Sequence, residues 1–405
     1  MQDYLKVVVT GEVDSGKSTL IGRFLYEVGS LPEGALREIR SVSHRLGSNF
    51  ELAYLLDSFE EERKGQLTID TTQVFCRNKK GRDLIFIDVP GHRELIKNML
   101  SGSSYADIAI LVIDIKKSIE EGTRRHINIL KFLGIKQIIF VLNKADLVSF
   151  NEEIFNKIQK EITEFSKKIG IQPQYVIPIS AIQGDNISKK SLNISWYKGL
   201  SLAEVLNTLN KESKKEVSNS FYFPIQDIYS IDSQKICVGS IISGEIKRGE
   251  GIKTTPFNQE SQVKEIKVFG GTQTLAQAPE SIGLVLTEPN NFQRGQIIYR
   301  GESPEISAGV LAKIFCVYPI NLNERLLFKC TTQESYAKIE RINRVFDNSG
   351  LELNQVTSNL KEMDAAEALI VLEKPVAVKK FQQFNILGRF VLQDKRGICA
   401  VGIIL

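Results

Sequence analysis

A stretch near the amino terminus limits the folds open to this chain more than any other feature. It fits the pattern G-x-x-x-x-G-K-[S/T] and consists of Gly11, Glu12, Val13, Asp14, Ser15, Gly16, Lys17, Ser18 and Thr19. It follows a short apolar run and leads into a helical pattern that begins at Leu20. Glycines here let successive backbone N–H groups converge on phosphate oxygens, and the helix N-terminus adds partial positive charge. The stretch predicts a phosphate loop, although a lone match also fits a glycine turn before a helix.

Two side chains of this loop have specific expected roles in binding a nucleoside triphosphate. We expect Lys17 to reach the outer phosphates, where it would also act in catalysis, and Ser18 to ligate Mg²⁺. The other residues from Glu12 to Thr19 are candidates for contact with the bound cofactor.

Composition restricts the class of protein but says little about partners. The chain has 405 residues, enough for two or three domains, and its net charge of +4 is too small to indicate nucleic acid or an acidic membrane. The five cysteines form no C-x-x-C pair, which predicts neither a disulfide framework nor a zinc site. The amino terminus resembles no signal peptide, and no apolar run approaches the length of a membrane span. We expect a cytoplasmic protein.

The first half of the chain alternates apolar β-rich runs with helical periods. The predicted strands are residues 5–10, 72–77, 84–88, 108–114, 137–143 and 174–179, and the clearest helices are residues 121–133, 152–169 and 202–210. This alternation predicts an α/β domain with a mainly parallel sheet, whose functional loops lie at the carboxyl ends of the strands. Residues 22–64 are less regular, and we expect a long mobile segment there.

The pattern changes after a polar, charged run at residues 211–220, which has the composition of a linker. From Phe221 onward, short alternating runs are separated by glycine-containing turn signals and long helical periods disappear. The sequence predicts two all-β barrels in this half. The expected domains are residues 1–215, 221–303 and 304–405.

A second motif follows the predicted strand at residues 84–88. Asp88, Val89, Pro90 and Gly91 form the D-x-x-G of phosphate-loop NTPases, in which Asp88 would hold Mg²⁺ and the Gly91 amide would sense the γ-phosphate. On its own the tetrapeptide also fits a Pro-Gly turn. The next residue, His92, is a candidate for orienting the attacking water, and it also fits a histidine that caps a helix.

A third motif selects the base. Asn143, Lys144 and Asp146 match N-K-x-D at the end of a strand. The Asp146 carboxylate can accept hydrogen bonds from the ring N–H and exocyclic amine of guanine, whereas adenine would leave it unpaired, a difference worth roughly 10⁴ or more in discrimination. Lys144 can lie along the base, and Asn143 can bridge loops. The tetrapeptide alone also fits a helix cap.

A fourth signal follows the strand at residues 174–179, where the Ala181 amide of Ser180-Ala181 would bind guanine O6. Four motifs in this order, each at a strand end, indicate a guanine-nucleotide site.

The four motifs, together with the run Gly122-Thr123-Arg124-Arg125-His126, resemble the translational-factor GTPase superfamily. The Arg124–His126 segment, residues 180–187 and Trp196-Tyr197-Lys198-Gly199 are similar to one family within it, the GTPase subunits of bacterial sulfate adenylyltransferase. The resemblance implies GTP and Mg²⁺ as cofactors. It also implies that Thr68 is the switch threonine that reaches Mg²⁺ and the γ-phosphate, and that Leu147 and Ile182 contact the nucleotide.

The resemblance also implies a partner. In that family GTP hydrolysis is coupled to the adenylation of sulfate by ATP, which takes place in a separate catalytic subunit of the ATP-pyrophosphatase type. We therefore expect a hetero-oligomer, with no nucleic acid and no membrane as partner. The alternative is an elongation-factor-type, GTP-dependent carrier of aminoacyl-tRNA, since both would share the GTP-binding domain.

Overall fold

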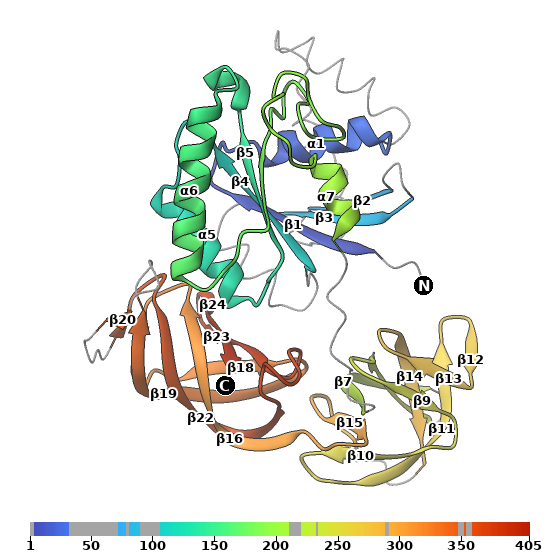
Figure 1. The fold of residues 1–405 in the computed structure, drawn as a ribbon. Helices are drawn as coiled ribbons and strands as arrows, with labels where there is room; N and C mark the ends of the chain where they lie inside the picture. Colours follow the sequence, from blue (N-terminus) through green and yellow to red (C-terminus); the bar gives the residue numbers. More distant parts are fainter. Residues whose placement is uncertain are drawn as a thin grey trace. The chain divides into compact units, whose positions relative to one another are not determined.

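The computed structural model describes most of the chain, and its contacts divide it into two compact units (Figure 1). The described residues are 4–31, 72–77, 81–89, 106–209, 220–231, 234–287, 291–346, 352–353 and 359–405. The first unit comprises residues 1–212 with 348–350, and the second comprises the remainder. The first unit holds helices and a largely parallel sheet, and the second is built from β-strands.

The sheet of the first unit has the strand order β2-β3-β1-β4-β5-β6. Its strands are β1 (Leu5–Gly11), β2 (Thr72–Arg77), β3 (Asp83–Asp88), β4 (Ile108–Asp114), β5 (Ile138–Asn143) and β6 (Tyr175–Pro178). All neighbours pair in parallel except β2, which is antiparallel to β3. Strands β4 and β5 are buried along their whole length, as expected for parallel strands covered on both faces. The predicted α/β domain is confirmed.

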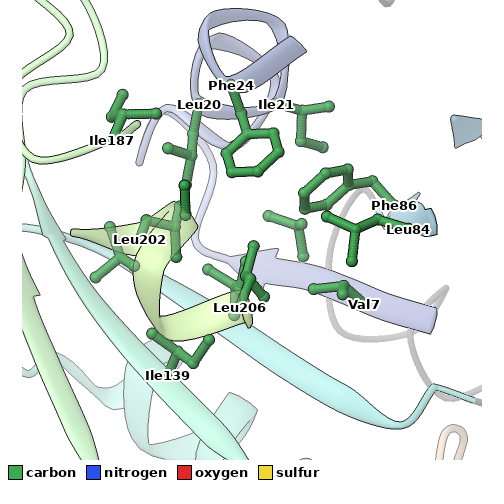
Figure 2. Packing of buried hydrophobic residues seen from close by; sticks show 14 of the residues in the cluster. Val7, Leu20, Ile21, Phe24, Leu84, Phe86, Ile139, Ile187, Leu202 and Leu206 are labelled. Carbon is green, nitrogen blue, oxygen red and sulfur yellow. The ribbon is translucent and has the colours of Figure 1, made fainter. Parts of the chain in front are cut away.

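Helices cover both faces of this sheet. They are α1 (Lys17–Val28), α5 (Glu121–Phe132), α6 (Glu152–Lys168) and α7 (Leu202–Thr208), with a 3₁₀ turn, η1 (Ala145–Val148). Because strand side chains alternate, Val7 and Val9 of β1 pack in the cluster that α1 and α7 share (Figure 2). Thr10 points to the opposite face, where its hydroxyl lies 2.9 Å from Nδ1 of His126 on α5. Helix α6 joins α5 there, since Arg124 stacks over Phe165.

Helix α1 corrects two details of the sequence-based prediction. It begins at Lys17 rather than Leu20, because Gly16 at its N-cap is left-handed and lets the phosphate loop turn directly into the helix. It also continues to Val28, so residues 22–28 belong to a regular helix and the expected mobile segment is wrong there. Its buried residues recur at helical spacing (Figure 2). Residues 32–64 of that predicted segment lie outside the described residues.

The second unit contains two barrel-like sheets. The first has the order β10-β15-β7-β8-β14-β11-β12 and closes because β10 also pairs with β11. Its strands are β7 (Phe221–Ile231), β8 (Gln234–Ser240), β10 (Gly251–Thr255), β11 (Glu260–Val268), β12 (Gly271–Gln273), β14 (Ser281–Leu286) and β15 (Ile297–Arg300), and β9 (Glu245–Lys247) pairs separately with β13 (Leu275–Gln277). Phe221, Phe223 and Ile225 fill its core from alternate positions of β7.

The second sheet has the order β18-β23-β24-β16-β22-β19-β20 and closes through the pairing of β18 with β19. Its strands are β16 (Glu305–Cys316), β18 (Leu326–Cys330), β19 (Gln333–Phe346), β20 (Glu352–Leu353), β22 (Ala365–Val378), β23 (Arg389–Asp394) and β24 (Gly397–Ile404), and β17 (Ile320–Asn321) pairs with β21 (Asn359–Leu360). The predicted change to all-β structure is confirmed. All five cysteines are buried free thiols, and among the described helices none has the length and apolar character needed to cross a membrane.

Phe24 is the residue through which α1 depends most on the sheet. Its ring is 1% exposed and lies 5.1 Å from that of Phe86 on β3, measured between ring centroids (Figure 2). We expect Phe24→Ala to lower the free energy of unfolding of the first unit by about 3–5 kcal/mol, because the cavity cannot fully collapse. Trp196, the chain's one tryptophan, lies in this unit and reports its unfolding by fluorescence.

Leu192→Ala is the matched control, because Leu192 belongs to the same unit and is 93% exposed. It should change the free energy of unfolding by no more than about 0.5 kcal/mol. Similar losses in the two variants would mean that α1 does not pack as described.

Candidate nucleotide-binding site

The phosphate loop connects β1 to α1 in a conformation that only glycine tolerates at two positions. Gly11 has a φ of 149°, and a Cβ there would lie 2.3 Å from the carbonyl oxygen of Val112. Gly16 has a φ of 89°, and a Cβ there would lie 2.3 Å from Nδ2 of Asn143. Asp14 between them is also left-handed. The two glycines of the motif therefore do what a phosphate loop requires, which is to let the backbone fold tightly onto the ends of β4 and β5.

Lys17 is held over this loop. Its Nζ donates hydrogen bonds to the carbonyl oxygens of Gly11, at 3.0 Å, and Glu12, at 2.8 Å. Burial lowers the pKa of the Lys17 ammonium below its usual value, and the carboxylates of Asp88 and Asp14 oppose that shift. The ammonium group is thus partly desolvated and preorganised at the position where the outer phosphates of a nucleotide would lie.

Ser18 and Asp88 lie together although 70 residues separate them in the sequence. The Ser18 hydroxyl, in the first turn of α1, donates to Oδ2 of Asp88 at the end of β3, at 3.2 Å. A hydroxyl beside a carboxylate is a suitable donor pair for Mg²⁺, which prefers hard oxygen ligands and retains several waters. Both predicted metal ligands that the structure describes therefore fit the ion. Thr68, the third, lies outside the described residues.

Glu12 is an unusual residue for a loop that binds anions. Burial raises the pKa of its carboxyl group, and a hydrogen bond with Glu120 raises it further. The Thr123 hydroxyl lies 3.4 Å from its Oε1, and a Cβ at Gly122 would lie 2.4 Å from the same oxygen. The side chain therefore packs against the N-terminal turn of α5.

Asn143 joins the phosphate loop to the loop that follows β6. Its side chain is 2% exposed; Nδ2 donates to the carbonyl oxygen of Ser15 at 2.9 Å, and Oδ1 accepts from the N–H of Ala181 at 3.0 Å. The expected bridge between loops is therefore present. It also engages the Ala181 N–H that we expected to bind guanine O6, so an O6 contact would have to share this donor.

Lys144 and Asp146 lie just beyond β5. The left-handed Lys144, whose φ is 66°, directs its Nζ to Oδ2 of Asp114 at 2.7 Å. The half-buried Asp146 carboxylate makes no hydrogen bond or ion pair with any residue that the structure describes. A carboxylate with free acceptor capacity is what recognition of guanine's N–H and amine groups requires.

Three apolar candidates are exposed around the site. Val13 of the phosphate loop, Leu147 of η1 and Ile182 after β6 are 76%, 51% and 69% exposed. Large exposed apolar side chains beside unpaired polar groups are typical of ligand sites. Ser180 is buried and its Oγ accepts from the N–H of Gln183, so it shapes the loop from inside. Thr19 lies in the first turn of α1.

Sequence reasoning missed Asp114, the ion-pair partner of Lys144. The available signal was its position, since it ends the predicted strand 108–114 just as Asp88 ends β3. Gly91 and His92, like Thr68, lie outside the described residues. Their roles, and that of Thr68, remain predictions.

The fold and the site agree on a class of protein. A phosphate loop after β1, an aspartate ending β3 and N-K-x-D after β5 lie at one edge of this sheet order, because parallel strands end on the same side. That arrangement is typical of phosphate-loop GTPases.

Comparison with known proteins identifies the family. Residues 2–221, more than half of the chain, match the model of the elongation factor Tu GTP binding domain, and residues 310–405 match that of the GTP-eEF1A C-terminal domain-like family. The chain therefore belongs to the translation-factor GTPase family, and GTP is the nucleotide that its first domain binds.

Two kinds of relative match over nearly the full length. Sulfate adenylyltransferase subunit 1 of Aliarcobacter butzleri is 34% identical over 96% of this chain and 84% of its own. Elongation factor 1-alpha of Pyrobaculum islandicum is 31% identical over 99% of this chain and 94% of its own. A solved structure of Sup35 complexed with GDP has 22% identity over 100% of this chain and 94% of its own, with a TM-score of 0.45.

The bridge made by Asn143 can be tested by removing it. We expect Asn143→Ala to raise the dissociation constant for GDP by up to about thirtyfold, because two buried hydrogen bonds that fix the loops are lost, each worth about 1 kcal/mol. Isothermal titration calorimetry measures this.

Asn186→Ala is the control. Asn186 is equally buried and also holds two backbone groups, the carbonyl of Pro178 and the N–H of Ser191, but it makes no hydrogen bond with the phosphate loop. Equal losses of GDP affinity in the two variants would contradict a specific role for Asn143.

Proposed function

We propose that this chain is the GTPase subunit of a sulfate adenylyltransferase. It would couple the hydrolysis of GTP to GDP and phosphate with the reaction of ATP and sulfate to adenylyl sulfate and pyrophosphate. The second reaction would take place in a separate catalytic subunit of the ATP-pyrophosphatase type, so the working protein would be a hetero-oligomer.

The full-length similarity to proteins named sulfate adenylyltransferase subunit 1 carries this proposal. That similarity includes the β-barrels as well as the GTP-binding domain, and the word "subunit" in those names implies a partner. A chain of this family has its GTP site in the first domain, and the barrels are the part that could transmit the state of the nucleotide to another protein.

Each residue of the site would have a separate role in the binding and hydrolysis of GTP. Lys17 would place positive charge against the outer phosphates, and Ser18 and Asp88 would hold Mg²⁺, which neutralises charge that develops on the phosphates. Asp146 would select guanine. Thr68 would order the switch segment in the triphosphate state, and His92 would orient the attacking water.

The second candidate function is a GTP-dependent carrier of aminoacyl-tRNA. The similarity to elongation factor 1-alpha, close to that of the sulfate enzymes in identity, favours it. Two of the three segments that resemble sulfate adenylyltransferase subunits make packing contacts: His126 contacts Thr10, and the indole N–H of Trp196 donates to the carbonyl of Phe150 at 2.8 Å. Their contacts support the GTP-binding domain and do not separate the two functions.

Co-expression tests the proposal directly. The chain would be produced with an ATP-pyrophosphatase-type subunit encoded beside it, and sulfate-dependent release of pyrophosphate from ATP would be measured with and without GTP. We expect the two chains to co-purify and GTP to raise the rate. Failure of both would refute the proposal, and a GTP-dependent, salt-sensitive gel shift of aminoacyl-tRNA would favour the alternative.

A substitution tests base selection separately. We expect Asp146→Asn to weaken GTP binding and to let xanthosine triphosphate bind, because the amide replaces one acceptor with a donor and suits the additional oxygen of xanthine. Competition between the two nucleotides measures the change. An unaltered preference for guanine would show that N-K-A-D does not contact the base.

A further inference from the structure

Helix α1 contacts the loop that follows β6 as well as the phosphate loop. The guanidinium of Arg23 donates from Nε to the carbonyl oxygen of Ala181, at 3.1 Å, and from Nη2 to the carbonyl oxygen of Ile182. These two residues lie 158 and 159 positions further along the chain. One side chain therefore holds two successive peptide groups of the segment that is expected to meet guanine O6.

Glu27, one turn further along α1, supports this contact. Its Oε1 lies 3.8 Å from Nε of Arg23, and its Oε2 accepts from the N–H of Ser188 at 3.2 Å. A Cβ at Gly184 would lie 2.2 Å from Oε1 of Glu27, so the loop needs glycine there to let the carboxylate approach. The side chains of Arg23 and Glu27 are only 15% and 17% exposed, so this ion pair is part of the packed structure and not a fluctuating surface pair.

Because a peptide group is planar, the contact with Arg23 also sets the direction of the N–H of Ile182. In a trans peptide the C=O and the following N–H point in opposite directions. Because Arg23 binds the carbonyl of Ala181, the N–H of Ile182 is directed away from α1. That N–H donates to no residue in the described part of the chain, whereas the N–H of Ala181 donates to Asn143.

We propose that Arg23 is a positioning residue for guanine recognition. By binding the carbonyl of Ala181 it fixes the peptide group that carries the N–H of Ile182, so that this N–H presents a donor to O6 of the base beside the N–H of Ala181, which Asn143 holds. The proposal rests on the proposed function, in which Asp146 selects guanine, and on the expected contact of this loop with O6. Arginine suits the task because its planar fork binds two carbonyls at once, which the single ammonium of lysine does less well.

A purely structural role is the competing explanation, and the chain offers a matched control for it. Nη1 of Arg82 donates to the carbonyl oxygens of Leu206 and Asn207, at 3.0 and 3.2 Å, at the end of α7. Arg82 thus also binds two successive carbonyls in the same unit, but at a segment where no nucleotide contact is expected. Arg82→Ala reports what the loss of such a clamp does to stability alone.

The test uses three diphosphates, which avoid hydrolysis during titration. GDP offers the complete base. 6-Thio-GDP replaces O6 with a larger sulfur that accepts hydrogen bonds weakly, and IDP lacks the exocyclic amine but keeps O6. The preference for GDP over 6-thio-GDP therefore reports on the loop after β6, and the preference for GDP over IDP reports on Asp146. Dissociation constants would be measured for the wild type, Arg23→Ala, Arg23→Gln and Arg82→Ala.

We expect the wild type to prefer GDP over both analogues. In Arg23→Ala the affinity for GDP should fall about five- to tenfold, the worth of one well-placed hydrogen bond, and the preference over 6-thio-GDP should shrink by a similar factor. The preference over IDP should not change. Arg23→Gln keeps one donor and should show a smaller shift in the same direction, while Arg82→Ala should leave both preferences unchanged.

The outcomes separate this proposal from the one on which it rests. An unchanged preference over 6-thio-GDP in Arg23→Ala overturns the positioning role, as does a wild type that binds GDP and 6-thio-GDP equally. If Arg23→Ala does not fold, judged by Trp196 fluorescence, Arg23→Gln decides in the same way. A wild type that binds GDP and IDP equally refutes the contact with Asp146 instead.

Discussion

A single buried amide, that of Asn143, joins the two halves of the nucleotide site. One half is the phosphate loop, held through the carbonyl of Ser15, and the other is the loop after β6, held through the N–H of Ala181. Both loops extend from strand ends, and Asn143 links them directly, in addition to the contacts that Arg23 and Glu27 of α1 make with the second loop. Because the amide has a donor and an acceptor group, one buried side chain satisfies both backbone partners.

The charged residues of the site are arranged around that bridge. The ammonium of Lys17 is partly desolvated, which makes its electrostatic interaction with phosphate stronger than it would be in water. Lys144 is paired with Asp114, so a second positive charge is fixed near the base site without repelling the first. Asp146, in contrast, keeps its acceptor capacity for the ligand. The paired Lys144 and Asp114 therefore support the structure of the site, whereas the unpaired Asp146 carboxylate is available for recognition of the base.

The sequence predicted the elements of this site better than the contacts between them. Strands β4 and β5 could be predicted because their residues are apolar without interruption, and the motifs at their ends follow from fixed local spacing. The start of α1 was misjudged because Gly16 and Lys17 look like loop residues, although the left-handed Gly16 leads straight into the helix. The position of Asp114 at a strand end did not reveal its pairing with Lys144, and the contact of Arg23 with a loop 158 residues away had no local signal. Such pairs are decided only when the sheet order brings distant segments together.

Helix α1 also sets the distance between two parts of the site. Lys17 and Arg23 lie six residues apart on it, which corresponds to about 9 Å along the helix axis. The helix is regular between them, with glycines at its two caps. A rigid spacer of fixed length favours a ligand whose charged and aromatic ends are separated to match, and it gives no such advantage to a free base or to inorganic pyrophosphate. Binding at one end then raises the effective concentration of the ligand at the other. With Lys17 and Arg23 in the proposed roles, selection by length would follow from the backbone of α1.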